Sequence, residues 1–163
     1  MRPDVYWIDA ATGLRLAIMP RPRAGDWLED EIAGWRLEGV DVVVSLLEPD
    51  EAAELGLQRE AALCTAQGMR FLALPIPDRG VPESPAELRR LAAELAERLV
   101  QGEAVAIHCR AGIGRSSLVA ACVLACRGYD AEAAFALLAQ ARGVAVPDTD
   151  AQRNWVAAFR GQH

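Results

Sequence analysis

The fold is decided by one stretch of the sequence, AVAIHCRAGIGRS, which covers residues 104–116. Its first four residues form an apolar run that is typical of a short buried strand. An apolar helical pattern follows from Leu118 to Cys126, so that Cys109 lies on a glycine-rich turn between a strand and a helix. Backbone N–H groups at a helix N-terminus carry partial positive charge, and a concave run of such groups binds phosphate-like anions. The stretch therefore predicts an anion cradle with a cysteine at its base.

The side chains of this turn suit that chemistry. Cys109 can attack only as a thiolate, a form that a helix N-terminus and nearby positive charge favour. Gly112 and Gly114 permit backbone angles and a close anion approach that a Cβ would block. Arg115 offers a planar fork that matches two phosphate oxygens, and Ser116 can donate its hydroxyl to the sulfur and ease its departure. The predicted phosphate-binding residues are Arg110, Ala111, Gly112, Ile113, Gly114 and Arg115.

The pattern His-Cys-x-x-Gly-x-x-Arg-Ser, from His108 to Ser116, resembles the phosphate-binding loop of the protein tyrosine and dual-specificity phosphatases. The resemblance implies a cysteine-dependent phosphomonoester hydrolase that forms a phosphocysteine on Cys109 and needs no metal or other cofactor. It also implies that His108 orients the loop by hydrogen bonding and does not act as a base. The structural alternative is a buried cysteine beside a helix-capping, glycine-rich turn.

A second segment, PIPDRGVP at residues 75–82, contains the candidate general acid. Asp78 precedes Cys109 by 31 residues (109 − 78), which resembles the small dual-specificity phosphatases. One carboxyl group can protonate the leaving oxygen and later deprotonate the attacking water. Taken alone, Pro-Asp-x-Gly also predicts a simple turn. The amino-acid sequence of this segment resembles that of the cyclin-dependent kinase-associated phosphatase and its bacterial relatives. The resemblance runs from about Val40 to the C-terminal helix.

Two further residues each have a catalytic and a structural interpretation. Related phosphatases place a glutamine in a late loop, where it orients the hydrolytic water, and Gln152 is the candidate here. Thr149 and Gln152 also fit a helix capping box, so both interpretations stay open. Some related phosphatases protect the nucleophile with a disulfide, and Cys64 is the candidate partner of Cys109 by position.

For several arginines and cysteines outside the turn, the sequence gives weaker indications of a functional role. Arg79 follows the candidate acid and either contacts substrate or lies at the surface. Arg21 and Arg23 either line the rim of the cleft or belong to a rigid surface loop. Cys122 and Cys126 are spaced four residues apart on an apolar helix, which favours core packing.

Composition limits the function classes. The 163 residues are 52% hydrophobic, which predicts one domain over residues 1–163. A net charge of −6 argues against nucleic acid or an anionic membrane as a partner. All 17 basic residues are arginine, which indicates a GC-rich, bacterial source. We find no signal-peptide pattern, membrane-spanning run or metal-ligand spacing. We therefore expect a cytoplasmic monomer without a metal.

Alternating strand and helix patterns predict an α/β fold, with a mostly parallel sheet covered by helices on both faces as in dual-specificity phosphatases. The first two strands are expected to pair as a hairpin, and Asp26 is a candidate cap for the first helix. The predicted strands are Asp4–Asp9, Leu14–Met19, Val40–Leu47, Met69–Leu74 and Ala104–His108. The predicted helices are Trp27–Leu37, Pro49–Leu55, Gln58–Gln67, Pro85–Gln101 behind a Ser84–Glu87 capping box, Arg115–Arg127, Asp130–Ala141 and Thr149–Arg160.

The leading substrate is phosphotyrosine in a protein, with phosphoserine and phosphothreonine as further candidates. A small phosphate ester or a phosphoinositide is the alternative within the same chemistry. Related phosphoinositide phosphatases carry lysines on both sides of the Ala-Gly of the loop, where this chain has Arg110 and Ile113. A non-catalytic phosphate-binding module is a second class, and sulfur transfer or arsenate reduction is a third.

Overall fold

A five-stranded sheet forms the centre of the computed structural model, which describes residues 2–159. The edge strand β1 (Tyr6–Trp7) runs antiparallel to its neighbour β2, and the other three pairs are parallel, so the predicted mostly parallel sheet is confirmed. In spatial order the strands are β1, β2 (Leu16–Met19), β5 (Val105–His108), β3 (Val42–Ser45) and β4 (Arg70–Ala73).

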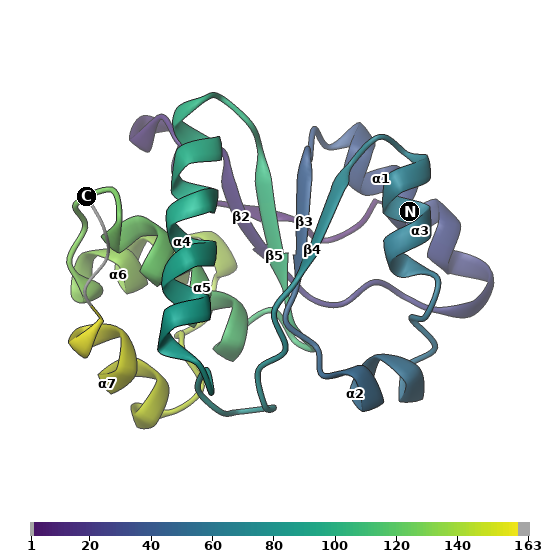
Figure 1. Cartoon of the computed structure of the whole chain (residues 1–163). Helices are drawn as coiled ribbons and strands as arrows, with labels where there is room; N and C mark the ends of the chain where they lie inside the picture. Colours follow the sequence, from purple (N-terminus) through teal and green to yellow (C-terminus); the bar gives the residue numbers. More distant parts are fainter. Residues whose placement is uncertain (1, 160–163) are drawn as a thin grey trace.

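Helices cover both faces of this sheet (Figure 1). One face carries α1 (Leu28–Leu37) and α3 (Glu60–Ala66), and α2 (Pro49–Glu54) lies beyond the carboxyl end of β3. The other face carries α4 (Pro85–Val100), α5 (Gly114–Ala125), α6 (Ala131–Arg142) and α7 (Asp150–Ala158).

Alternation along the strands divides the core into two clusters. Successive side chains of a strand point to opposite faces of the sheet. Val105 and Ile107 therefore pack with the residues of α4 and α5, whereas Ala106 packs with Trp35 of α1. Every residue of β2, β3 and β5 is buried, which explains the continuous apolar runs in the sequence. Helix α5 is buried from Gly114 to Leu124, and this burial fixes its N-terminus directly beyond β5.

The elements agree with the predicted order, but several ends differ. A 3-10 turn at Gly25–Trp27 precedes α1, and Asp26 lies inside that turn, so the prediction that Asp26 caps the helix is wrong. The N–H of Leu28 bonds back to the Gly25 carbonyl, which closes the turn without a side chain. Ser84 accepts the N–H of Glu87, which is the serine half of the predicted capping box. The returning bond from the Glu87 side chain does not occur in the described structure, so the box is incomplete. Arg160, the predicted end of the last helix, lies outside the described residues.

The amino ends of the central strands are held by Asp41. Its Oδ2 accepts the Ala104 N–H at 2.8 Å, and its Oδ1 lies 2.8 Å from Nη1 of Arg36. Burial alone would raise the pKa of Asp41, but these hydrogen bonds and the arginine charge outweigh burial, so that the pKa is lowered. Asp41 therefore stabilises the sheet as a carboxylate, at the end away from Cys109.

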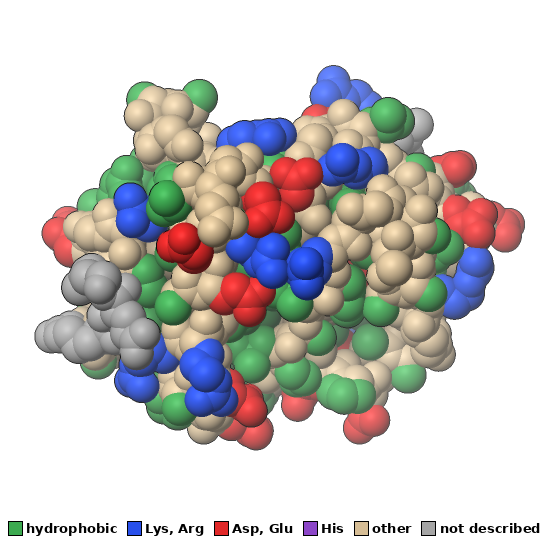
Figure 2. Space-filling model, turned by 45° about the horizontal axis from the view of Figure 1, so that its top comes forward, with side chains coloured by type: hydrophobic (Ala, Val, Ile, Leu, Met, Phe, Trp, Pro, Cys, Tyr) green, Lys and Arg blue, Asp and Glu red, His purple; other side chains and the backbone are tan. Residues whose placement is uncertain are grey.

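The charges on this side of the molecule are mixed. Figure 2 shows arginine and carboxylate side chains interspersed among apolar and neutral groups, with no wide area of a single sign. Within residues 2–159, no helix has both the length and the apolar character needed to cross a membrane.

Candidate active site

The loop that connects β5 to α5 lies at the carboxyl edge of the sheet, where α/β proteins bind their ligands. We call residues 109–113 the cysteine loop. Gly112 adopts a left-handed φ of +74°, and a Cβ on it would lie 2.5 Å from the carbonyl carbon of Met19 in β2. Glycine is required here both by its conformation and by the close approach of the β2 backbone.

The first two carbonyl groups of the cysteine loop are held from outside. Nδ1 of His108 lies 3.1 Å from the carbonyl oxygen of Cys109. The backbone N–H of Arg21 donates to the carbonyl of Arg110 at 3.1 Å. Both contacts come from outside the cysteine loop, from the end of β5 and from the segment after β2.

Arg142, at the end of α6, holds the next two carbonyl groups. Its Nη2 donates to the carbonyl of Ala111 at 3.2 Å, and its Nε donates to that of Gly112 at 3.3 Å. The guanidinium also lies over the ring of Tyr6, 4.3 Å from its centroid, which is within the range of a cation–π contact. Arg142 has no motif in the sequence and was not among the predicted site residues.

These contacts fix the direction of the loop's N–H groups. The C=O and the following N–H of a trans peptide point in opposite directions. The carbonyls of residues 109–112 are bound by groups outside the loop. We therefore expect the N–H groups of residues 110–113 to turn toward the inside of the loop. Four consecutive anchored carbonyls would thus give the predicted concave run of amides a physical cause.

Cys109 lies at the base of a pocket of about 260 Å³, and its side chain is nearly inaccessible, with 3% of the residue exposed. The hydroxyl of Ser116 donates to its Sγ at 3.0 Å, as the sequence predicts. The pocket is lined by Asp78, Arg79, Cys109, Arg110, Ala111, Gly114, Arg115 and Asp148.

Arg115 is buried and held rigidly by Glu51 of α2. Nη1 and Nη2 donate to the two carboxylate oxygens of Glu51 at 2.7 and 2.9 Å, and Nη1 also donates to the carbonyl of Ile76 at 2.9 Å. This end-on pairing leaves Nε and the second N–H of Nη2 on the other edge of the guanidinium. That N–H bonds to Asp78 at 3.2 Å, so a phosphate held by this edge would replace the contact.

The electrostatics keep both partners of this pair ionised. Burial would lower the pKa of Arg115, but the hydrogen bond to Glu51 and the charges of Cys109, Glu51 and Asp78 outweigh burial and raise it. The hydrogen bond from Arg115 lowers the pKa of Glu51 against the effect of burial. Arg110 lies at the rim, with Nε 3.5 Å from Glu51, and its side chain is 44% exposed.

Asp78 lies at the mouth of the same pocket. Its Oδ1 is 3.2 Å from Nη2 of Arg115, although the two residues are 37 positions apart in the sequence. The N–H of Gly80 bonds to the carbonyl of Pro77 at 2.8 Å and closes the turn of residues 77–80, which we call the Asp78 turn. Arg79 has a φ of +59° in this turn, a conformation that favours glycine, and its side chain lines the pocket.

Gln152 connects this turn to α7. It completes the capping box with Thr149, and its Nε2 also donates to the carbonyl of Gly80 at 3.0 Å. Gln152 therefore caps the helix, as the structural interpretation predicts. Its role in orienting a water stays a prediction. Its Oε1 also accepts the N–H of Asp148 at 3.1 Å.

Asp148 is a pocket carboxylate that the sequence analysis missed. Its Oδ2 packs so closely over Gly114 that a Cβ on that glycine would lie 2.5 Å away. Asp148 lies between a proline and the cap of a helix, a sequence that is typical of an ordinary loop, so the sequence did not mark it as a pocket residue.

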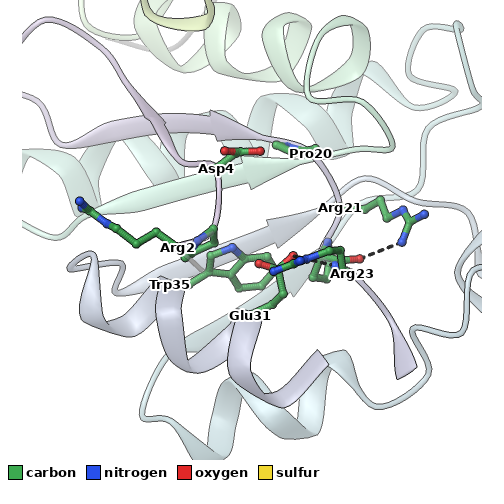
Figure 3. A pocket seen from close by; sticks show the side chains of 9 residues that line it. Arg2, Asp4, Pro20, Arg21, Arg23, Glu31 and Trp35 are labelled. Carbon is green, nitrogen blue, oxygen red and sulfur yellow. Dashed lines mark hydrogen bonds and ion pairs between the residues drawn. The ribbon is translucent and has the colours of Figure 1, made fainter. Parts of the chain in front are cut away.

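Arg21 and Arg23 line a separate cavity of about 420 Å³ with Glu31 and Trp35 (Figure 3). Nε of Arg23 lies 3.0 Å from Glu31, and Nη1 of Arg21 donates to the carbonyl of Pro22 at 3.0 Å. Neither side chain is among those that line the pocket around Cys109.

The remaining cysteines lie in the core. Cys64 of α3 belongs to the core cluster that includes the buried residues of α1, whereas Cys109 belongs to the cluster on the other face of the sheet. Burial, together with the charge of Glu60, raises the pKa of Cys64 to about 12, so this thiol stays protonated at neutral pH. Cys122 and Cys126 pack in the cluster around α5.

Comparison with known proteins agrees with this geometry. Residues 17–129 match the family described as "Tc-R-P: Polymorphic toxin system, DSP-PTPase phosphatase". The chain belongs to the dual-specificity phosphatase family. No curated protein matches this phosphatase.

Solved structures of phosphatases share its fold. A kinase-associated phosphatase whose catalytic-site cysteine is replaced by serine has a TM-score of 0.86 at 22% identity, over 98% of this chain and 94% of that one. Tk-PTP in its active form is 30% identical, with a TM-score of 0.72 and 94% of each chain covered. PTPMT1 in complex with PI(5)P is 20% identical, with a TM-score of 0.74 over 95% of this chain and 93% of that one.

The contacts of Gln152 give a prediction for this phosphatase. Gln152→Leu removes the half of the capping box in which Oε1 accepts the N–H of Thr149, and it also removes the bond from Nε2 to Gly80. Thr149→Ala removes only the other half, the hydroxyl that accepts the N–H of residue 152. We expect both variants to lose roughly 1–3 kcal/mol of unfolding free energy. Only Gln152→Leu should also lower kcat, because it frees the Asp78 turn. Denaturant unfolding and steady-state kinetics measure the two effects, and an equal kcat loss in both variants would contradict the assignment.

Proposed function

We propose that this protein is a cysteine-dependent phosphomonoester hydrolase that acts on phosphotyrosine in proteins, with phosphoserine and phosphothreonine as further substrates. The observation that carries the proposal is the convergence on one pocket of the Cys109 sulfur, the inward N–H groups of the cysteine loop and the guanidinium of Arg115. A merely structural cysteine would need none of these neighbours.

In the first step, the Cys109 thiolate attacks phosphorus opposite the leaving oxygen. The S–P bond forms, the P–O bond breaks, and the carboxyl group of Asp78 gives its proton to the leaving oxygen. The loop N–H groups and Arg115 hold the three equatorial oxygens as charge spreads over them. Because Glu51 fixes the guanidinium, Arg115 needs little reorganisation during this step.

In the second step, water attacks the phosphocysteine. Asp78, now a carboxylate, accepts a proton from that water while the O–P bond forms and the S–P bond breaks. The Ser116 hydroxyl already lies 3.0 Å from Sγ, and its hydrogen bond stabilises the departing thiolate. The enzyme returns to its starting state with inorganic phosphate as product. The thiol must stay reduced to act in this way, so we expect the protein to work in a reducing compartment such as the cytoplasm.

The surface beside the pocket supports a protein substrate over a polyphosphorylated one. A neighbouring cavity of about 440 Å³ shares Asp78 and Arg110 with the pocket. Its lining residues are Glu48, Pro49, Asp50, Glu51, Glu54, Asp78 and Arg110. This excess of carboxylates repels additional phosphate groups, so an inositol polyphosphate or a nucleotide fits this side poorly.

We predict that Cys109→Ser abolishes hydrolysis of p-nitrophenyl phosphate but retains the fold and phosphate binding, because only the nucleophilic sulfur is lost. Cys64→Ala is the matched control, since it also removes a buried sulfur but on the other face of the sheet, and it should keep kcat. Release of p-nitrophenol and thermal unfolding measure activity and folding. Full turnover by Cys109→Ser would remove Cys109 from the mechanism.

We predict that Asp78→Asn lowers kcat by about 10²–10⁴-fold on phosphotyrosine and abolishes the fall of activity on the basic side of the pH profile. The loss should be smaller for p-nitrophenyl phosphate, because p-nitrophenolate leaves without needing a proton. Asp148→Asn is the control from the same pocket and should keep the basic limb. If Asp148→Asn loses that limb and Asp78→Asn keeps it, the acid is Asp148.

We predict a higher kcat/KM for a phosphotyrosine peptide than for inositol phosphates or nucleotides. Parallel assays of phosphate release on these three substrate classes test the expectation. The variant Glu54→Gln, in the neighbouring cavity, should bring kcat/KM for inositol phosphates and nucleotides closer to that for the phosphotyrosine peptide, because it removes one of the repelling carboxylates. A preference for inositol phosphates in the unmodified protein would support the alternative substrate class.

A further inference from the structure

A buried carboxylate lies directly behind the cysteine loop. Oε2 of Glu60, the first residue of α3, is 2.6 Å from Nε2 of His108. The side chains of His108 and Glu60 are 0% and 4% exposed. Nδ1 of the same imidazole lies 3.1 Å from the carbonyl oxygen of Cys109. The ring of Trp35 lies beside the imidazole, with the ring centroids 5.9 Å apart.

The positions of the protons follow from these contacts. A carbonyl oxygen can only accept a hydrogen bond, so Nδ1 must carry a hydrogen. One further proton then lies between Nε2 and Glu60, either on the nitrogen of an imidazolium or on the oxygen of a carboxylic acid. The pair has no net charge in either arrangement. Its effect on Cys109 therefore acts through the direction of the Nδ1–H bond and not through added positive charge.

The peptide that joins Cys109 to Arg110 depends on this bond. A neutral imidazole without a partner can carry its hydrogen on either nitrogen. With the hydrogen on Nε2, the lone pair of Nδ1 would face the lone pairs of the Cys109 carbonyl. That carbonyl would turn away, and the N–H of Arg110, on the opposite side of the same peptide, would leave the pocket.

We propose that Glu60 is a positioning residue of the active site, which shares one proton with Nε2 of His108 and thereby keeps the hydrogen on Nδ1 that anchors the Cys109 carbonyl. The proposal rests on the proposed function, because it explains how the first N–H of the phosphate cradle is held. Glu60 reaches the cysteine loop only through His108 and does not line the pocket.

The surroundings agree with a proton-sharing role. Burying a carboxyl group in an apolar core costs free energy unless it is paired. The described groups around Glu60 and His108 include the neutral ring of Trp35 from α1 and the thiol of Cys64, one turn along α3. No arginine hydrogen bond or ion pair to Glu60 occurs within the described residues, so His108 is its hydrogen-bonding partner there.

Two variants of similar size test the proposal. Glu60→Gln keeps a donor that can bond to Nε2, so His108 retains its hydrogen on Nδ1, whereas Glu60→Leu has no hydrogen-bonding group. We expect Glu60→Gln to stay close to the unmodified protein. Compared with the unmodified protein, Glu60→Leu should bind inorganic phosphate about tenfold more weakly and have a lower kcat.

The ¹⁵N chemical shifts of the His108 ring give a readout that a purely structural role would not change. Nδ1 should carry a hydrogen in the unmodified protein and in Glu60→Gln, and should lose part of it in Glu60→Leu. Asp41→Asn is the matched control, because it removes a carboxylate that anchors the opposite end of β5. It should lower stability without changing the ring shifts or phosphate affinity.

Two results overturn the proposal. One is an Nδ1 without hydrogen in the unmodified protein, which can be observed even if Glu60→Leu fails to fold. The other is a folded Glu60→Leu with unchanged phosphate affinity and ring shifts. Neither result depends on turnover, so failure of this proposal is distinct from failure of the proposed function, which rests on turnover by Cys109→Ser.

Discussion

The outward anchoring of four consecutive carbonyl groups is the constraint on which the site depends. Free peptide groups in a glycine-containing loop would sample many orientations, and an anion would have to order them on binding. Here the donors come from an imidazole, a backbone amide and one guanidinium, on three parts of the chain. The ordering is thus completed during folding, which is the condition for strong electrostatic stabilisation of a transition state.

Two carboxylates hold the basic side chains on which the site depends, namely His108, which anchors the loop, and Arg115, which lines the pocket. Glu51 fixes Arg115, and Glu60 pairs with His108, so each acidic group reaches the pocket through a basic one. Both carboxylates come from short helices on the segment between β3 and β4. The segment places these two carboxylates at the carboxyl edge of the sheet although it contains no catalytic motif.

The sequence was most informative where local patterns and chemistry coincide. The strand, turn and helix around Cys109 were predicted from apolar periodicity and glycine placement, and the mostly parallel sheet followed from the alternation of elements. Contacts over long sequence separations could not be predicted in this way, as Arg142 with the carbonyls of the loop shows. Glu60 did leave a signal, because it falls on the same helical stripe as the buried Leu57 and Cys64. A charged residue on an apolar stripe needs a buried partner, and His108 was available.

The contact between Arg142 and Tyr6 bears on where a minimal catalytic fragment could be cut. The family match covers residues 17–129 and contains every motif residue of the cysteine loop and the Asp78 turn. A fragment with those limits would lose Tyr6, Arg142 and Gln152, which brace the site from both ends of the chain. Motif content alone is therefore a poor guide to truncation, since both ends of the chain are part of the scaffold.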